Sequence, residues 1–326
     1  MKALALFSGG LDSMLAMKLA TDQGIEVIAL HVNIGFGPDK GKHALMRQRA
    51  KQVGATLEVY DARQTYLDEV LFSPLHGYGK HFNPCIDCHG FMFRLAKTLL
   101  PLYGAEFIIT GEVVGQRPMS QHMRAIRTVT ALAQDEDKLI VRPLCAKLLE
   151  ETLPEKEGWI DRAQLLDISG RSRERQIALA QAHGLDDYEP PAGGCLLTHA
   201  SFSNKIKDVL AHGEFTLEDI ALLRHGRHLR LPGGAKLVIG RDEADNGALE
   251  ELTHSKYDFI DLGELIGPAA WLEKCASTTD REFALRLVLS YAKTSPEISY
   301  TLSFNQTFFT LTPLPSRAVA QEYLIR

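Results

Sequence analysis

The feature that most constrains this fold is a glycine-rich turn between a short apolar run and a helix-like segment. The apolar run Ala3–Phe7 is followed at once by Ser8-Gly9-Gly10-Leu11-Asp12-Ser13, and Leu11–Thr21 has the leucine spacing of a helix. Glycines let the backbone approach an anion, and a helix N-terminus offers unpaired N–H donors and a positive dipole end. We therefore predict a phosphate-binding loop that joins a buried strand to a helix.

Strand-like and helix-like segments alternate after this loop. The further strands are expected at Glu26–Val32, Thr56–Tyr60 and Glu106–Thr110, and the helices at His43–Val53, Phe91–Leu100 and about 172–182. This alternation predicts a doubly wound parallel α/β sheet, in which ligands bind at the carboxyl ends of the strands. Ser8, Asn33, Asp61 and Gly111 each follow a strand, so we expect them to face one site.

A second region begins near Ala200, and its strand-like runs lie at Lys236–Ile239, Ser299–Phe304 and Thr307–Leu311. We predict a first domain at residues 1–199 and a smaller α+β domain at 200–326, which suits a length of 326 residues. The run Ala3–Phe7 is too short for a signal-peptide core, and no stretch approaches the roughly 18 apolar residues that span a bilayer. We expect a cytoplasmic protein with no membrane partner.

Asp12 is the unusual member of the loop, because a carboxylate repels phosphate unless a cation lies between them. A role as a Mg²⁺ ligand would explain it. The loop lacks the Gly-Lys-Ser/Thr ending of a Walker A loop. It resembles instead the PP-loop family of ATP pyrophosphatases, whose motif is Ser-Gly-Gly-x-Asp-Ser. Members of that family cleave ATP between the α- and β-phosphates and attach AMP to a carbonyl oxygen of the substrate.

This resemblance implies ATP and Mg²⁺ as cofactors and a catalytic role for Asp12. It places ATP at Ser8–Ser13 and implies that Asn33, Thr110 and Gly111 lie near the nucleotide. For Asn33, a plain turn residue is an equally good interpretation.

Three of the five cysteines form a pattern of their own. Cys85 and Cys88 have the C-x-x-C spacing of a metal or cluster edge, and Cys195 follows Gly193 and Gly194, which would let the backbone approach another group closely. An odd number of cysteines in a chain expected to be cytoplasmic argues against a disulfide framework. We interpret Cys145 and Cys275 as small buried residues, the latter in a helix-like stretch.

A cysteine pair with one distant cysteine resembles the tRNA thiolation branch of the PP-loop family. There, three cysteines hold a [4Fe–4S] cluster whose open iron presents hydrosulfide, so the resemblance implies that Cys85, Cys88 and Cys195 are metal-binding and catalytic. Two alternatives stay open: a persulfide on one cysteine that another resolves as a disulfide, and a zinc ion completed by His81 or His89. The sulfur donor would be hydrosulfide or a cysteine desulfurase system.

Arginines occur in groups near these segments. The groups are Arg117, Arg124 and Arg127; Arg171, Arg173 and Arg175; and Arg224, Arg227 and Arg230. Since the net charge is −5, RNA would have to bind through such local patches. A single arginine is more often solvated surface, but the grouping favours phosphate contacts.

The stretch 237–246, together with 258–262 and Gly267-Pro268, resembles the NFACT RNA-binding module over about residues 200–270. The thiolation resemblance covers about residues 1–199. The chain lacks the C-terminal barrel that two-thiouridylases usually have, and it has a distinct loop after Arg142, so the modified base is left open.

We predict an ATP-dependent tRNA-uridine sulfurtransferase that adenylates a base carbonyl and replaces its oxygen by sulfur. tRNA is the expected partner, and a homodimer is compatible with the sequence. A small-molecule ligase or amidotransferase on the same fold explains the loop but not the cysteines. An RNA-binding or iron–sulfur sensing protein without catalysis leaves Asp12 without a role.

Overall fold

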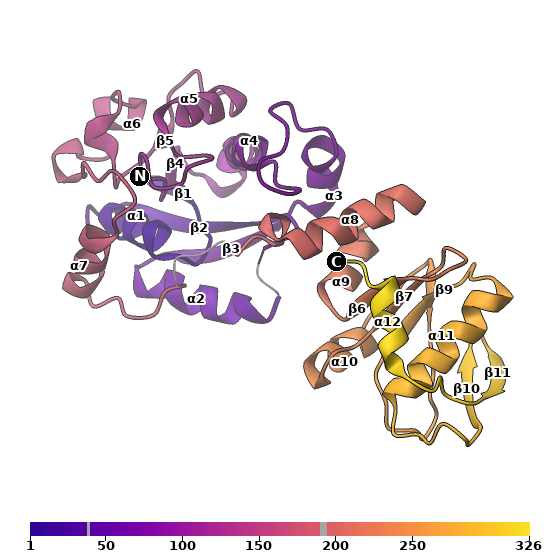
Figure 1. The fold of residues 1–326 in the computed structure, drawn as a ribbon. Helices are drawn as coiled ribbons and strands as arrows, with labels where there is room; N and C mark the ends of the chain where they lie inside the picture. Colours follow the sequence, from indigo (N-terminus) through magenta and orange to yellow (C-terminus); the bar gives the residue numbers. More distant parts are fainter. Residues whose placement is uncertain (38–39, 190–193) are drawn as a thin grey trace. The chain divides into compact units, whose positions relative to one another are not determined.

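The chain folds into two compact units, residues 1–196 and 197–326, in a computed structural model that describes residues 1–37, 40–189 and 194–326 (Figure 1). The helices and strands of the first unit are β1 (Lys2–Leu6), α1 (Leu11–Thr21), β2 (Glu26–Asn33), α2 (His43–Gln52), β3 (Thr56–Asp61), α3 (Arg63–Tyr66), α4 (Cys85–Tyr103), β4 (Phe107–Thr110), α5 (Met123–Leu132), β5 (Ile140–Val141), α6 (Leu153–Lys156) and α7 (Glu174–Ala182).

A parallel sheet in the order β3-β2-β1-β4-β5 forms the centre of the first unit. The register aligns Leu6 at the end of β1 with Leu30 of β2 and Thr110 of β4. The strand order reverses at β1, and ligands in such sheets bind at the carboxyl ends of the strands that flank this reversal. The predicted doubly wound α/β fold is confirmed, and the short strand β5 lies at the edge of the sheet beside β4.

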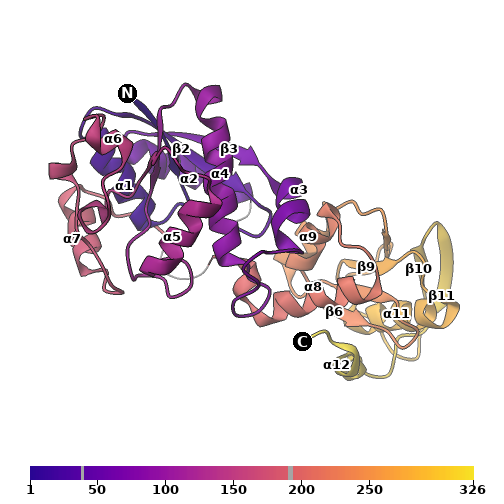
Figure 2. The same ribbon diagram turned by 90° about the horizontal axis from the view of Figure 1, so that it is seen from above.

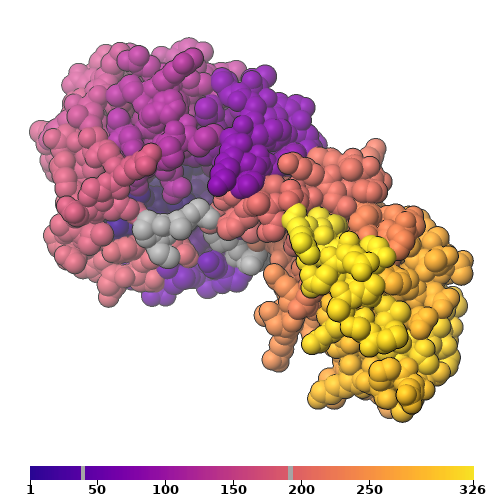
Figure 3. Space-filling model, viewed as in Figure 1, coloured from indigo at the N-terminus to yellow at the C-terminus, as the bar shows by residue number. Residues whose placement is uncertain are grey.

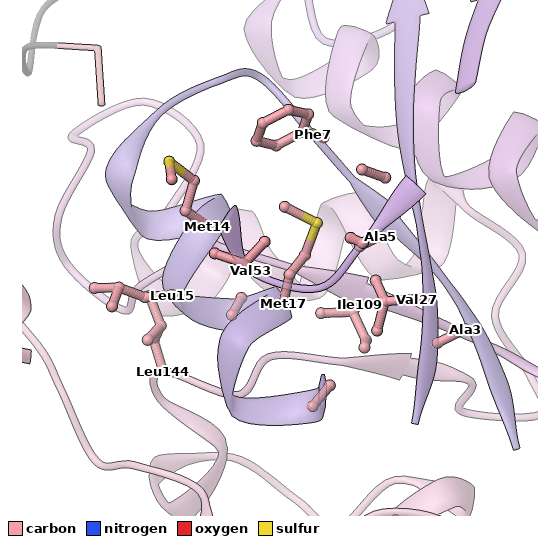
Figure 4. Packing of buried hydrophobic residues seen from close by; sticks show 14 of the residues in the cluster. Ala3, Ala5, Phe7, Met14, Leu15, Met17, Val27, Val53, Ile109 and Leu144 are labelled. Atoms are coloured by element: carbon pink, nitrogen blue, oxygen red, sulfur yellow. The ribbon is translucent and has the colours of Figure 1, made fainter. Parts of the chain in front are cut away.

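One face of this sheet is covered by α1, α2 and α7, whose buried side chains share one core. The alternate residues Ala3 and Ala5 of β1 are small and fully buried, and Met17 of α1 lies beside Ala5 (Figure 4). Side chains alternate between the two faces of a strand, so these alanines leave room for the long methionine on one face only. This packing fixes α1, and with it the loop that precedes α1.

The opposite face carries α4, which contacts β1 and β4, and α5, which packs on α4 (Figure 2). The helix predicted to start at Phe91 begins at Cys85, so that prediction was wrong by almost two turns. The Asp87 carboxylate accepts hydrogen bonds from the backbone N–H groups of Leu75 and His76, both at 3.0 Å, and ties the preceding loop to the first turn of α4. Cys85 and Cys88 therefore lie on a helix.

The second unit joins an antiparallel sheet, in the order β6-β7-β9-β8, to helices and to a separate hairpin of β10 and β11. Its elements are α8 (Ala200–His212), α9 (Leu217–Arg224), β6 (Arg227–Arg230), β7 (Lys236–Ile239), α10 (Glu243–Glu250), β8 (Tyr257–Phe259), β9 (Ala270–Glu273), α11 (Thr278–Tyr291), β10 (Tyr300–Phe304), β11 (Thr307–Leu311) and α12 (Ala320–Tyr323). This is the smaller α+β fold that the sequence predicts. The C-terminal residues lie at its surface, in yellow in Figure 3.

The two remaining cysteines differ from each other. Cys145 is fully buried, as expected, and its Sγ lies 3.3 Å from the carbonyl oxygen of Glu112. Cys275 is exposed in the turn between β9 and α11, so its interpretation as a buried helix residue was wrong. No helix within the described ranges combines the length and the apolar character needed to cross a bilayer.

Candidate active site

The predicted phosphate loop lies at the carboxyl end of β1. Gly9 adopts φ +80°, a left-handed conformation that favours glycine, and Gly10 precedes the first turn of α1. Gly10 has no side chain that could accept from the N–H groups of that turn, so these donors are left for an anion. The Ser13 hydroxyl donates to the Gly10 carbonyl oxygen at 2.8 Å and stabilises the loop, whereas Ser8 is exposed.

Gly111, at the end of β4, closes the loop from the other side. A Cβ atom at this position would lie 2.5 Å from the backbone nitrogen of Ser13 and 2.6 Å from the carbonyl carbon of Asp12. Only glycine allows β4 to approach the start of α1 so closely. Thr110 is buried beside it, and its hydroxyl accepts from the backbone N–H of Glu112 at 3.3 Å.

Asp12 has one satisfied and one unsatisfied carboxylate oxygen. Its Oδ2 accepts from Gln116 Nε2 at 2.6 Å and from the Arg173 guanidinium at 3.1 Å. Its Oδ1 is buried and has no hydrogen-bond partner among the described residues. An unpaired buried carboxylate oxygen is costly unless a ligand satisfies it, and hard cations such as Mg²⁺ prefer oxygen donors. The residues present therefore fit the expected magnesium.

Asn33 lies at the end of β2, where its side-chain oxygen accepts from the Gly35 N–H at 3.0 Å. This is the local hydrogen bond of a turn residue, and it fixes the path of the chain after β2.

The three candidate cysteines all lie near enough to Tyr66 to affect its hydroxyl group. Burial raises the pKa of the Tyr66 hydroxyl well above its usual range, and the neighbouring Cys88, Cys195 and Cys85 raise it further. Burial also raises the pKa of Cys88, and the neighbouring Cys195 adds to this effect. The structure thus brings the distant Cys195 to the pair on α4. Within the described ranges, no three His, Cys, Asp or Glu side chains are gathered closely enough to hold a metal ion.

The segment that carries Cys195 is held at both ends against the site. Before the cysteine, the Glu189 N–H donates to the carbonyl oxygen of Gly9 at 3.3 Å; after it, the Leu196 N–H donates to the carbonyl oxygen of Phe36 at 3.0 Å. Buried Arg49 of α2 reinforces the first contact by pairing with Glu189 at 3.2 Å.

The glycines before Cys195 were expected to permit a close backbone approach. Gly193 lies outside the described residues. Gly194 is exposed, and a Cβ there would meet no described atom within 4 Å, so the described part of the chain offers no close neighbour at this position.

A hydrogen-bonded network extends from Cys85 into the interior. Burial alone would raise the pKa of Cys85, but the hydrogen bond and charge of His89 outweigh it and lower that pKa. His89 Nδ1 lies 3.0 Å from Glu112 Oε1, and Arg142 Nε donates to Glu112 Oε2 at 2.9 Å. Burial alone would lower the pKa of His89, but its bonds to Cys85 and Glu112 raise it to about 10.

The sequence offered little sign of this network. From the sequence, His89 is expected near the site only as an alternative zinc ligand, and no motif marks Glu112 or Arg142. Their one local signal is that Glu112 directly follows Gly111, which places it at the end of β4.

The arginines of the first unit divide into two kinds. Arg117, Arg124 and Arg171 are exposed, in line with the predicted contacts to RNA. Arg173 is largely buried, with 16% of its side chain exposed, and its partner is Asp12. Arg173 therefore belongs to the loop region rather than to an open RNA-binding surface.

In the second unit the predicted arginines also differ. Arg230 forms ion pairs with Asp208 at 2.6 Å and with Glu273 at 3.3 Å, which commits its guanidinium to the fold. Arg224 ends α9, and Arg227 lines a surface cavity.

The parallel sheet and the loop at Ser8–Ser13 define a domain of the PP-loop class. Residues 1–153 match the family described as thiamine biosynthesis protein (ThiI), and residues 226–324 match the NFACT protein RNA binding domain. Residues 1–153 thus belong to the PP-loop thiolation type, and the second unit carries a module of the NFACT RNA-binding type.

Several known proteins are similar to part of this chain. A probable tRNA sulfurtransferase of Thermococcus kodakarensis is 28% identical over 151 residues, which cover 46% of this chain and 38% of that protein. A tRNA-specific 2-thiouridylase MnmA of Helicobacter hepaticus is 30% identical over 169 residues, which cover 46% of this chain and 48% of that protein. The structure of a 4-thiouridine synthetase–RNA complex with bound ATP aligns with this chain at a TM-score of 0.41 and 19% identity. The alignment covers 56% of this chain and 41% of that chain. The matches thus span less than half of each of these proteins.

Proposed function

We propose that the protein is an ATP-dependent tRNA sulfurtransferase that replaces a carbonyl oxygen of a tRNA uridine by sulfur. The observation that carries the proposal is the attachment of the Cys195 segment to the phosphate loop through the hydrogen bond from Glu189 to Gly9. One site then holds both an activating loop and thiols. The ThiI and NFACT matches support this assignment.

In the activation step, the uncapped N–H groups of α1 bind the phosphates of ATP. Asp12 Oδ1 would hold Mg²⁺, which neutralises phosphate charge. The base carbonyl oxygen attacks the α-phosphate, pyrophosphate leaves, and AMP becomes bonded to that oxygen. Enclosure of the site would protect the adenylated base from water.

In the sulfur step, a sulfur nucleophile attacks the activated carbon, and AMP leaves with the original oxygen. Cys85, Cys88 and Cys195 would supply the three thiolate ligands of a [4Fe–4S] cluster, and such a cluster would present hydrosulfide to the base. In the described part of the chain these thiols are not gathered closely enough to hold a single metal ion, so this role rests on their chemistry and on the resemblance rather than on a formed site. Hydrosulfide supplies both electrons of the new bond, so this route needs no external reductant.

The activation step is tested with Asp12→Ala. The variant should lose release of AMP and pyrophosphate, because the cation would lose its carboxylate ligand. Asp22→Ala, which removes a carboxylate just beyond the other end of α1, is the matched control and should keep activity. If the wild-type protein released ADP and phosphate instead, the assignment of the loop would be wrong.

The sulfur step is tested with alanine at each of Cys85, Cys88 and Cys195. Each variant should lose thiolation of tRNA and most of the iron bound after anaerobic reconstitution, while adenylation survives. Cys275→Ala is the control, since Cys275 is exposed in the second unit. Full iron content in Cys195→Ala, or a colourless wild-type protein that binds one zinc ion, would contradict the cluster.

A second candidate for the sulfur step is a persulfide on Cys85, and the position of His89 beside that thiol favours it. A cysteine desulfurase system would transfer sulfane sulfur to Cys85. The outer persulfide sulfur would attack the activated carbon of the base and displace AMP. A second cysteine would then attack the sulfur of Cys85, which forms a disulfide between the two cysteines and releases the thiolated base, and an external thiol reductant would restore both thiols. A persulfide trapped by alkylation on Cys85, in iron-free protein that still thiolates tRNA, would support this route against the cluster.

A further inference from the structure

The second unit contains a surface cavity of about 780 Å³, and its lining includes Arg227 and parts of the stretch 237–246 and of Gly267-Pro268, which resemble the NFACT RNA-binding module. Its wall comes from the start of β6, the residues around the start of α10, the segment 266–268, the end of α11 and the residues just before and within α12. The segments of the wall are held together: the Lys293 N–H after α11 donates to the Ile266 carbonyl oxygen at 2.8 Å. The cavity has a size typical of sites that hold small molecules or a nucleotide.

Four cationic side chains, Arg227, Arg241, Lys293 and Arg317, line this cavity. Arg241 is paired with Asp245 within the unit, and Arg227 donates to the Gly240 carbonyl oxygen at 3.0 Å. For Lys293 and Arg317, the described part of the chain supplies no carboxylate partner within ion-pair distance.

The carboxylates that line the cavity offset part of this charge. They are Asp242 and Glu243. Asp242 is engaged as the N-cap of α10, where it accepts from the Asp245 N–H at 2.9 Å. Four cations against two carboxylates leave the lining net positive in a chain whose overall charge is −5.

Tyr291 at the end of α11 holds two of these cations in place. The guanidinium carbon of Arg227 lies 5.5 Å from the centre of the Tyr291 ring, and that of Arg317 lies 5.6 Å from it. Both distances are within the range of cation–π attraction. Residues far apart in the sequence are thus gathered on one ring, although like charges repel, and an anion bound beside them would relieve that repulsion.

We propose that this cavity binds a phosphate group of a single-stranded segment of RNA, with Arg317 and Lys293 as the phosphate contacts and with Tyr291 and Arg227 as positioning residues. A guanidinium presents paired N–H donors that match a phosphate. A concave site suits an unstacked nucleotide better than the regular surface of a duplex. The proposal takes RNA as the ligand from the proposed function, and it adds where and through which groups RNA binds.

The test is a binding titration of the full chain with a fluorescent 12-nucleotide single-stranded RNA at several salt concentrations. Arg317→Ala and Lys293→Ala should each weaken binding on the order of tenfold and lower the slope of log K against log salt by about 0.7, the value for one lost phosphate contact on a single strand. Lys207→Ala, which removes an exposed cation of α8, is the control and should change neither quantity. Arg317→Lys keeps the charge but loses the paired donors, so it should keep the slope and lose affinity.

Wild-type affinity and slope in both alanine variants would overturn the proposal. An equal loss of affinity for a 12-base-pair RNA duplex would overturn its single-strand part. Thiolation of tRNA by the wild-type protein is measured separately. If the wild type binds RNA through these residues but does not thiolate, the cavity assignment stands and the proposed function fails. If the wild type thiolates tRNA while the alanine variants bind RNA normally, the proposed function stands and the cavity assignment fails.

Discussion

Replacement of Glu112 by glutamine tests the buried network behind Cys85. The two ends of the central ion pair are almost wholly enclosed, since the side chains of Glu112 and Arg142 are 4% and 6% exposed. Glutamine keeps the shape of the side chain and removes its charge. The Arg142 guanidinium would then be buried without an opposite charge, and His89 would lose its carboxylate partner.

The burial of this ion pair determines how much stability the Glu112→Gln variant should lose. Removal of one partner of a buried ion pair costs about 3–5 kcal/mol. In a unit of 196 residues, each kcal/mol lowers the melting temperature by about 2–4 °C, so a fall of about 6–20 °C is expected. The matched control is Asp167→Asn, which removes an ion pair with Arg175 whose side chains are both 56% exposed. That change should cost at most about 1 kcal/mol.

The assay is calorimetric unfolding of the full chain, in which the transition of the second unit serves as an internal reference. The double variant Glu112→Gln/Arg142→Met should lose less stability than the sum of its two single variants, because the first change already leaves the cation unpaired. Equal losses in Glu112→Gln and Asp167→Asn would refute the reasoning, and so would additive effects in the double variant.

Gly111→Ala should abolish release of AMP and pyrophosphate, since its Cβ would lie 2.5 Å from the Ser13 nitrogen; Gly247→Ala, which meets no atom within 4 Å, should keep that activity. Burial lowers the pKa of Lys205 to about 8 from 10.5, so the unfolded chain binds more protons than the folded chain between these values. Wild-type stability should therefore rise relative to Lys205→Met as the pH increases from 8 to 10.5, and parallel urea-unfolding profiles would contradict this. Asp280→Ala should lower the free energy of unfolding in urea by about 1–3 kcal/mol, because this buried carboxylate accepts from two backbone N–H groups of the turn before β7. A loss below about 0.5 kcal/mol would show that water satisfies these N–H groups in place of the carboxylate.

Local patterns in the sequence were enough to predict the phosphate loop and the strands and helices around it. The segment predicted as a helix, Leu11–Thr21, is α1 to the residue, and β2 and β3 end within one residue of the predicted limits. These features depend on neighbours along the chain. Glycine permits the backbone angles of the loop, and the spacing of apolar residues decides which face of a helix or strand is buried.

The prediction failed where contacts over longer distances decide the structure. The start of α4 is tied down by Asp87 through the backbone of the preceding loop, and no periodic apolar pattern marks that turn. Cys275 lies exposed because the chain turns after β9, whereas its neighbourhood in the sequence resembled a helix.

The sequence by itself determined the PP-loop class, the alternating fold and the residue types of the site. Only the tertiary structure decided which charges meet: Arg173 pairs with Asp12, Arg230 pairs with Asp208, and Arg317 reaches Tyr291. The physical reason is that backbone angles and apolar periodicity act over a few residues. An ion pair or a cavity depends instead on where the chain returns after many residues, and on which of several equivalent arginines the packing encloses.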